Sequence, residues 1–600
     1  TGKNITIDAT AIDAADTANL IIDASGVTAA ATGKQITYTD GAGATQITLG
    51  QDDDTATMGV GNDTVVGTSG ANTIDMGAGN DSVTAGTGIE NISGGDGNDT
   101  INLAGNLTAL DTIDGGAGTD TLILSGAIAN DTILGGVSNI ETIKYSGAVG
   151  ITLDSNISAT NFDMTSTHNS TLTLSAGYTD AVTVFLTTSA ASDATANQDA
   201  VINGGGTTYA NTTLTVVGEA DAFDAGTTLT GGTGTDTLQI SQKATSGNAT
   251  AKIDGDITGF DKIIVTDTAG NNTGGVTLDI NDAAYATALD IDTTALDAGE
   301  ADTIQAGNAT AAITVNAGEG ISTIDTGTKA DTINSGGGND VINSQAGLDN
   351  ISAGSGNDSI TFDTEADFLT TLGTSTVDGG SGTDTLTFSA AATLTTAEVT
   401  NISNVEVLSL TTGSTLTVND AFLAANPGLV IQPGASSTIK ASTATGDALS
   451  TALNISANAA GNLSLLGGTG DDTFTFYATE TLTVLDTVNG GTGSDQIIID
   501  IVDATPQAGV GANTSAVLDT NISNIETVKI RDVATDDGGG SGTIITATVT
   551  LNSGFTGSSL TIDGSDLDMH PTTLTGGERL TVDASNNAAT EVITALGGAF

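Results

Sequence analysis

The chain has 600 residues, of which 72 are acidic and 11 basic, giving a formal net charge of −61. This excess of carboxylates argues against binding nucleic acid or an anionic membrane by charge attraction, and it suits a protein whose counterions are metal ions. The absence of cysteine excludes disulfides and thiolate chemistry, and no apolar run approaches the ~20 residues that span a bilayer.

Residues 1–57 carry no diagnostic motif. We expect them to be β-rich, because Thr alternates with Ile, Val or Leu along most of the chain, with breaks at Gly, Asn, Asp and Ser. Helical patterns are nearly missing, and short helices are expected only at residues 282–288 and 395–399. The chain starts without Met and ends like an interrupted coil, so we expect a fragment or processed form of a longer protein.

Residues 58–102 form five consecutive nonapeptides: MGVGNDTVV, GTSGANTID, MGAGNDSVT, AGTGIENIS and GGDGNDTIN. Their sixth positions hold Asp63, Asn72, Asp81, Glu90 and Asp99, and their eighth positions hold Val65, Ile74, Val83, Ile92 and Ile101. Residues 326–361 repeat the pattern four times. Asp331, Asp340, Asp349 and Asp358 are sixth, and Ile333, Ile342, Ile351 and Ile360 are eighth.

The first six residues of each unit must turn tightly, which glycine does without strain, and the last three form a short strand with its central side chain inward. Stacked units place their carboxylates about 4.8 Å apart, where they repel one another. Calcium takes about six to eight oxygen ligands, more than one turn supplies, so we expect each ion between turns and folding coupled to binding. The repeat is typical of calcium-binding β-solenoids.

A disordered linker is the alternative interpretation of such glycine- and aspartate-rich sequence. It does not explain a branched aliphatic in register in all nine units. We therefore expect both blocks to be folded with calcium and disordered without it. Asn72 removes a charge and is expected to weaken its site, whereas Glu90 keeps the charge on a longer side chain.

Five single copies of the turn occur at residues 115–120, 231–236, 379–384, 467–472 and 490–495. Each ends in an aspartate, with an apolar residue two positions later. The expected ligands are Asp120, Asp236, Asp384, Asp472 and Asp495, followed by Leu122, Leu238, Leu386, Phe474 and Ile497. One turn supplies about half of a calcium shell and needs a degenerate neighbouring coil to complete it. A plain glycine turn is the alternative.

A strand with an acidic residue between aliphatics follows four of these aspartates after 21 to 31 residues. Residues 137–143, 402–408 and 522–528 share the pattern Ser-Asn-x-Glu, and residues 257–263 are a looser copy. Glu141, Glu406 and Glu526 are then either calcium or inter-coil ligands, or outward-facing residues that keep strand register. The second interpretation is favoured.

The succession of GGxGTDTL and ISNxE resembles bacterial surface-layer proteins of the RTX type, from about residue 58 onward. The resemblance implies export by type I secretion and self-assembly into a calcium-dependent two-dimensional lattice on the cell surface. We recognise neither the secretion signal nor the anchoring domain of that family in the sequence. A segment of a secreted RTX adhesin or biofilm matrix protein is the alternative function.

An enzyme carrying RTX repeats is the third hypothesis, and we expect no enzyme. The sequence has no Gly-x-Ser-x-Gly elbow and no His-Glu-x-x-His helix. Both histidines, His168 and His570, are isolated and are expected at surface or turn positions.

The sequence therefore predicts an all-β protein of elongated right-handed parallel β-solenoid segments (β-roll or β-helix) that binds several Ca²⁺ ions. We expect a β-rich segment at 1–57, a calcium-binding block at 58–125, a module at 126–325, a second block with its module at 326–425, and a C-terminal module, cut short, at 426–600. The expected location is extracellular, on the bacterial surface. The expected partners are other copies of the chain and, through a region outside it, a cell-surface polysaccharide. We expect no nucleic acid and no membrane insertion.

Overall fold

The computed structural model describes residues 4–11, 20–28, 35–103, 105–125, 131–146, 150–153, 157, 159–165, 170–174, 178, 180–186, 201–203, 213–223, 227–232, 234–241, 249–253, 255–267, 274–280, 287–370, 373–443, 449–457, 461–477, 482–501, 514–518, 521–532, 546–551, 559–566, 579–583 and 592–597. The chain forms two compact units, Thr1–Ala311 and Ala312–Phe600.

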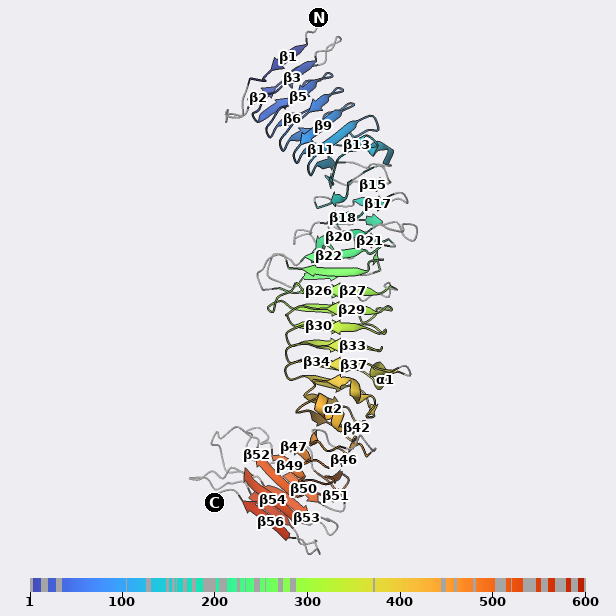
Figure 1. Cartoon of the computed structure of the whole chain (residues 1–600), viewed down its shortest axis with the longest axis vertical. Coiled ribbons are helices and arrows are strands. Elements are labelled where there is room, and N and C mark those ends of the chain that lie inside the picture. Colours follow the sequence, from blue (N-terminus) through green and yellow to red (C-terminus); the bar gives the residue numbers. More distant parts are fainter. Residues whose placement is uncertain are drawn as a thin grey trace, which may run out of the picture. The chain divides into compact units, whose positions relative to one another are not determined.

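The first unit is built from ladders of parallel strands, which Figure 1 shows stacked coil upon coil. One ladder contains β1 (Ile5–Asp8), β3 (Ile36–Thr39), β5 (Thr55–Thr57), β7 (Thr73–Asp75), β9 (Asn91–Asp96), β11 (Thr112–Ala117) and β13 (Val137–Ser138). A second contains β2 (Leu20–Asp23), β4 (Thr45–Thr48), β6 (Thr64–Val66), β8 (Ser82–Thr84), β10 (Thr100–Asn102), β12 (Thr121–Leu124), β14 (Thr142–Tyr145), β16 (Asn161–Asp163), β18 (Val182–Phe185), β20 (Leu214–Glu219), β22 (Thr237–Ser241), β25 (Lys262–Thr266) and β27 (Leu289–Asp292).

Two shorter ladders complete this unit. One contains β15 (Gly150–Leu153), β17 (Thr171–Leu174), β19 (Val201–Asn203), β21 (Thr228–Thr230) and β24 (Ile257–Thr258). The other contains β23 (Ala249–Lys252), β26 (Val276–Asp279) and β28 (Asp302–Gln305). Short 3₁₀ turns at Asp131–Leu134 and Ala220–Ala222 lie between coils.

The second unit repeats this architecture. One ladder contains β29 (Ile313–Asn316), β31 (Thr332–Asn334), β33 (Asn350–Ser352), β37 (Thr376–Asp378) and β40 (Ile402–Ser403). The longest contains β30 (Ser322–Asp325), β32 (Val341–Asn343), β34 (Ser359–Phe362), β38 (Thr385–Phe388), β41 (Val407–Leu410), β43 (Val430–Gln432), β45 (Asn454–Ala457), β47 (Thr473–Tyr477), β49 (Gln496–Ile501), β52 (Thr527–Asp532), β54 (Ser559–Asp566) and β56 (Val592–Gly597).

Two further ladders of the second unit follow. They contain β39 (Thr393–Leu394), β42 (Thr415–Val418), β44 (Thr438–Ala441), β46 (Ser464–Leu466), β48 (Thr487–Asn489) and β51 (Ile522–Ser523), and then β50 (Thr514–Leu518), β53 (Thr546–Leu551) and β55 (Arg579–Asp583). Within the described residues, the antiparallel pair is β35 (Leu369–Thr370) with β36 (Gly373–Thr374).

The nonapeptide period explains the coil. Val65 pairs with Val83, 18 residues later, so one coil contains two nonapeptides and successive units fall on opposite ladders. The eighth-position side chains of both blocks are at most 1% exposed and fill a narrow core between the ladders. The parallel all-β solenoid predicted from the sequence is confirmed.

Helices occur only in insertions between coils, as far as the structure describes the chain. They are α1 (Glu365–Phe368) and α2 (Asp420–Ala425), where the Asn419 side chain accepts the Phe422 N–H and starts the helix. The helix predicted at 395–399 is wrong, because these residues form a turn that leads into a 3₁₀ turn at Val399–Asn401. The one predicted at 282–288 lies largely outside the described residues. Among those described, no helix has the length and apolarity needed to cross a membrane.

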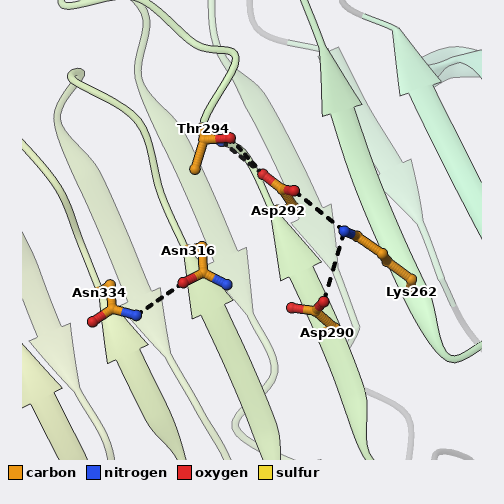
Figure 2. A network of polar contacts seen from close by, with 6 residues as sticks. All are labelled: Lys262, Asp290, Asp292, Thr294, Asn316 and Asn334. Atoms are coloured by element: carbon orange, nitrogen blue, oxygen red, sulfur yellow. Dashed lines mark hydrogen bonds and ion pairs between the residues drawn. The ribbon is translucent and has the colours of Figure 1, made fainter.

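The outer surface of the coils carries polar ladders. In the first unit, Lys262 Nζ lies 3.3 Å from Asp292 and 3.7 Å from Asp290, both on the next strand of the ladder (Figure 2). In the second unit, the Asn334 amide donates to the Asn316 side chain at 2.8 Å (Figure 2). These partly exposed contacts hold neighbouring coils in register, each worth about 1 kcal/mol or less.

Candidate metal sites

All thirteen predicted ligands are buried: Asp63, Asp81, Glu90, Asp99, Asp120, Asp236, Asp331, Asp340, Asp349, Asp358, Asp384, Asp472 and Asp495 are at most 3% exposed. Acidic side chains are almost never buried so completely unless they are paired. Their burial follows from the fold, because the sixth position of each nonapeptide turns inward immediately before a short strand.

The carboxylates are stacked in columns along the coils. In the first block, Asp81 Oδ1 accepts the backbone N–H of Asp63 at 2.7 Å, Asp99 accepts that of Asp81 at 2.8 Å, and Asp120 accepts that of Asp99 at 2.8 Å. The second block repeats this arrangement. Asp358 accepts the backbone N–H of Asp340 and Asp384 that of Asp358, each at 2.8 Å, and Asp349 accepts that of Asp331 at 2.9 Å.

Three of the turns that look solitary in the sequence, those of Asp120, Asp384 and Asp495, therefore follow a carboxylate of the preceding coil. The spacing between successive column members is 18 residues inside a block, and it lengthens to 21 before Asp120 and to 26 before Asp384. Asp495 likewise accepts the backbone N–H of Asp472, 23 residues earlier, at 2.8 Å. Asp236 and Asp472 instead accept the backbone N–H of Leu214 and Leu453, so the coil before them has no carboxylate at that position.

The second carboxylate oxygen of most column members has no hydrogen-bond donor. This holds for Asp63, Asp81, Glu90, Asp99, Asp120, Asp331, Asp349, Asp358, Asp384 and Asp495. A buried acceptor without a partner costs about 1–3 kcal/mol, and more when it is charged. Ten such oxygens on the turns where calcium is expected fit a bound cation, so these residues suit the ion that the sequence predicts.

Two predicted ligands differ. Asp472 Oδ2 accepts the backbone N–H of Gly468 at 2.9 Å, and Asp236 Oδ2 accepts that of Gly232. In the turn before Asp120, the corresponding Gly116 has a φ of +98° and donates its N–H to Asp114 Oδ1 at 3.2 Å instead. Gly468 is not left-handed. In these two turns, a change in the conformation of the second glycine thus goes with a change in the partner of its N–H.

Burial raises the pKa of the column carboxyls. It raises the pKa of Asp81, Glu90 and Asp331 to about 7. The pKa of Asp63, Asp349, Asp384 and Asp495 rises to about 6 for the same reason. Neighbouring carboxylates add to the effect, as Asp99 and Asp63 do for Asp81. Without a cation, these carboxyls therefore hold their protons to a higher pH than free carboxyls do, and a divalent ion can take the place of the protons.

Asn72 occupies a column position without a carboxylate. Its Oδ1 accepts the Asp54 N–H at 3.1 Å, and its Nδ2 donates to Glu90 Oε1 at 3.4 Å. The side-chain amide therefore supplies a donor at a position where the other units of the block carry an acidic acceptor.

Asp54 extends the same column into residues 1–57, where no diagnostic motif was recognised. Residues 40–48 (DGAGATQIT) and 49–57 (LGQDDDTAT) are two more nonapeptides, with Ile47 and Ala56 fully buried at the eighth position. Asp54 Oδ1 accepts the Ile36 N–H at 2.7 Å, and Oδ2 accepts the Gly50 N–H at 2.9 Å. The signal was the period of nine, which is hard to see because Thr45 takes the sixth position of one unit and Ala56 the eighth position of the other.

Two columns end on carboxylates that the protein satisfies by itself. Asp111 Oδ1 accepts the Glu90 N–H at 2.8 Å, while Oδ2 accepts the Thr108 N–H at 2.6 Å. Asp486 Oδ1 likewise accepts the Leu463 N–H at 2.9 Å, and its Oδ2 accepts the Thr483 N–H at 2.7 Å. A Thr-x-x-Asp turn thus closes this edge of the coil without an ion.

Calcium sites of these columns need main-chain oxygens. Within the described part of the chain, no three acidic or histidine side chains gather closely enough to hold one ion. The carbonyls of the glycine turns must therefore complete each shell of about six to eight oxygens. When bound, the ion would neutralise carboxylates of two coils and join them.

The comparisons with known proteins agree with this geometry. A family model, the RTX calcium-binding nonapeptide repeat, matches residues 57–89, 84–105, 110–126, 316–351, 325–360 and 345–369. The chain therefore carries RTX calcium-binding nonapeptide repeats, in both predicted blocks and at the turn 115–120. No curated protein and no solved structure matches the chain.

Proposed function

We propose that the chain is a secreted structural protein of a bacterial surface layer, exported by type I secretion, which assembles with its own copies into a calcium-dependent two-dimensional lattice. The observation that carries the proposal is the contact between each glycine turn and the strand that follows it in the stack of coils. Turns of the GGxGxD type are followed by Ser-Asn-x-Glu strands, and in the structure the glutamate of each such strand bonds the aspartate of its turn. The two halves of the pattern that resembles surface-layer proteins thus form one structural unit.

The physical basis of assembly is the coupling of calcium to coil order. Unpaired carboxylate oxygens destabilise the stack when the ion is absent, so calcium makes the coils rigid. A solenoid exposes unpaired strand edges at its ends unless they are capped, and contact with another copy satisfies them. Sites of about 10⁻⁴–10⁻³ M affinity fill at extracellular calcium levels. We propose no catalytic activity; both histidines lie outside the described residues.

Electron microscopy of the purified chain, with about 5 mM calcium and with chelator, tests the function; this concentration exceeds the weak extracellular range. Ordered sheets that disappear on chelation are expected. Isolated rods that stiffen with calcium and never associate would contradict the lattice and favour an adhesin or matrix protein. Identical images under both conditions would overturn the role of calcium.

A further inference from the structure

Three strands end the metal columns in the same way. They are the Ser-Asn-x-Glu segments, here called the closing strands: residues 137–143, 402–408 and 522–528. Glu141 Oε2 accepts the backbone N–H of Asp120, Glu406 that of Asp384, and Glu526 that of Asp495, each at 2.8 Å. The glutamates are partly exposed, yet they bond the preceding coil and do not only face outward. They therefore take the place that an aspartate holds elsewhere in a column.

The asparagine of each closing strand brings a carbonyl oxygen to the same place. Asn139, Asn404 and Asn524 have φ values of +50°, +52° and +54°, in the left-handed region. The Asn139 side chain donates to Asp114 at 2.7 Å, and those of Asn404 and Asn524 donate to Asp378 at 2.7 Å and Asn489 at 2.8 Å. This bond fixes the turn that directs the asparagine carbonyl at the glycine coil.

That carbonyl converges on the unpaired carboxylate oxygen. A Cβ atom placed on Gly115 would lie 1.9 Å from Asn139 O and 2.8 Å from Asp120 Oδ2. At Gly379 the corresponding distances are 2.0 Å to Asn404 O and 2.9 Å to Asp384 Oδ2, and at Gly490 they are 2.1 Å to Asn524 O and 2.4 Å to Asp495 Oδ2.

The three aspartates are at most 1% exposed, and their Oδ2 atoms have no donor. Each buried aspartate oxygen and the asparagine carbonyl oxygen approach the same glycine. Both atoms are acceptors, so a cation between them would relieve their repulsion.

We propose that each closing strand supplies the second half of a calcium site to the glycine turn before it, through the asparagine carbonyl and the glutamate carboxylate. The sites lie at Asp120/Asn139/Glu141, Asp384/Asn404/Glu406 and Asp495/Asn524/Glu526. Each glutamate uses only Oε2 for the backbone bond within the described residues, which leaves Oε1 for the ion. These sites are hybrids of a nonapeptide turn and a strand outside the nonapeptide pattern.

The looser copy at residues 257–263 provides a matched control. Asp261 Oδ2 accepts the Asp236 N–H at 2.9 Å, and Gly259, with a φ of +74°, places its carbonyl 2.0 Å from a Cβ on Gly231. Asp236 Oδ2, however, already accepts the Gly232 N–H. The geometry is similar, but the oxygen that would attract the ion is satisfied, so this position is expected to remain without calcium.

The test counts calcium ions per chain by equilibrium dialysis on dilute, unassembled protein. The triple variant Glu141→Gln, Glu406→Gln and Glu526→Gln keeps an acceptor for each backbone N–H and loses a charged ligand at each site. We expect it to bind three fewer ions than the unchanged chain, and each single variant one fewer, whereas Asp261→Asn should lose none. Circular dichroism in calcium checks that β content is kept.

An unchanged number of ions and unchanged affinity in the triple variant would overturn the proposal. Loss of an ion in Asp261→Asn would overturn it as well, because the unpaired Oδ2 would then not decide binding. The number of bound ions depends on the calcium-binding repeats and not on the lattice. If the triple variant binds three fewer ions but the unchanged chain forms no sheets, only the proposed function is refuted and the calcium sites stand.

Discussion

Replacing Asn72 by aspartate is expected to have opposite effects on the first block with and without calcium. In the variant, an oxygen replaces Nδ2, which lies 3.4 Å from Glu90 Oε1. At this distance two unit charges repel by about 5 kcal/mol at an effective dielectric constant of about 20. Protonation limits this cost, because the pKa of Glu90 is already raised to about 7 by burial.

The net cost in stability is the smaller of the charge repulsion and the cost of keeping Glu90 protonated. Holding a proton on Glu90 one pH unit above its pKa costs about 1.4 kcal/mol, so at pH 8 we expect the calcium-free block to lose about that amount. In calcium the new carboxylate should admit one further ion. At about 5 mM calcium, a site with a Kd of about 10⁻⁴ M contributes about 2 kcal/mol, which exceeds the cost.

Hydrogen exchange of peptides covering residues 64–102 measures both effects. In chelator at pH 8 we expect exchange about tenfold faster than in the unchanged chain, and in calcium slower exchange with one more ion bound. Asn91→Asp, on an exposed position of β9, is the control and should change stability by less than about 0.5 kcal/mol. Unaltered exchange in chelator together with an unaltered calcium count would refute the assignment of Asn72 to a metal position.

Changing Asp340 and Asp349 to Ala should lower the calcium count of the second block and weaken assembly while most β content remains; an unchanged count by titration calorimetry would contradict the columns. Gly95→Ala should destabilise the first block by at least about 1–3 kcal/mol, because its φ is +102° and a Cβ would lie 1.9 Å from Gly77 O, whereas Gly26→Ala, with open space around it, should be near neutral in thermal melting. Calcium-free protein should be most stable below about pH 4 and lose stability as pH rises through the raised pKa values of about 6 to 7. Calcium affinity should instead increase from pH 6 to 8, and the reverse pH trend in either measurement would rule out the buried carboxyls as its source.

The sequence was sufficient for the coil and for most of the columns. A period of nine with a branched aliphatic at the eighth position leaves one way to bury that side chain, which is to stack strands in parallel. The burial of Val65 and Ile342 follows from this directly. That Asp99 and Asp120 belong to one column could not be predicted, because they are 21 residues apart and the period of nine is lost between them.

Other contacts of the sites depend on a backbone conformation that differs between turns with the same residues. The turns before Asp472 and Asp495 both begin with Gly-Gly, yet Gly468 donates to its carboxylate, whereas the left-handed Gly491 donates to Asn489 at 3.1 Å. Glu141 was predicted to face outward, since its neighbours in sequence alternate as on an ordinary strand. The left-handed Asn139 precedes it and turns the chain, so that its carboxylate meets the coil before it.

The two edges of one coil are held by different means. At the coil that contains Asp111 and Asp120, the first carboxylate is bonded by Thr108 and Glu90, while the second has an oxygen without a donor. The coil of Asp486 and Asp495 has the same asymmetry. Removal of calcium should therefore not loosen such a coil evenly. The side of the coil with the Thr-x-x-Asp turn keeps its hydrogen bonds, and the side with the unpaired aspartate oxygen separates first. The coils then remain joined along one side, so they can close again in the same register when calcium returns.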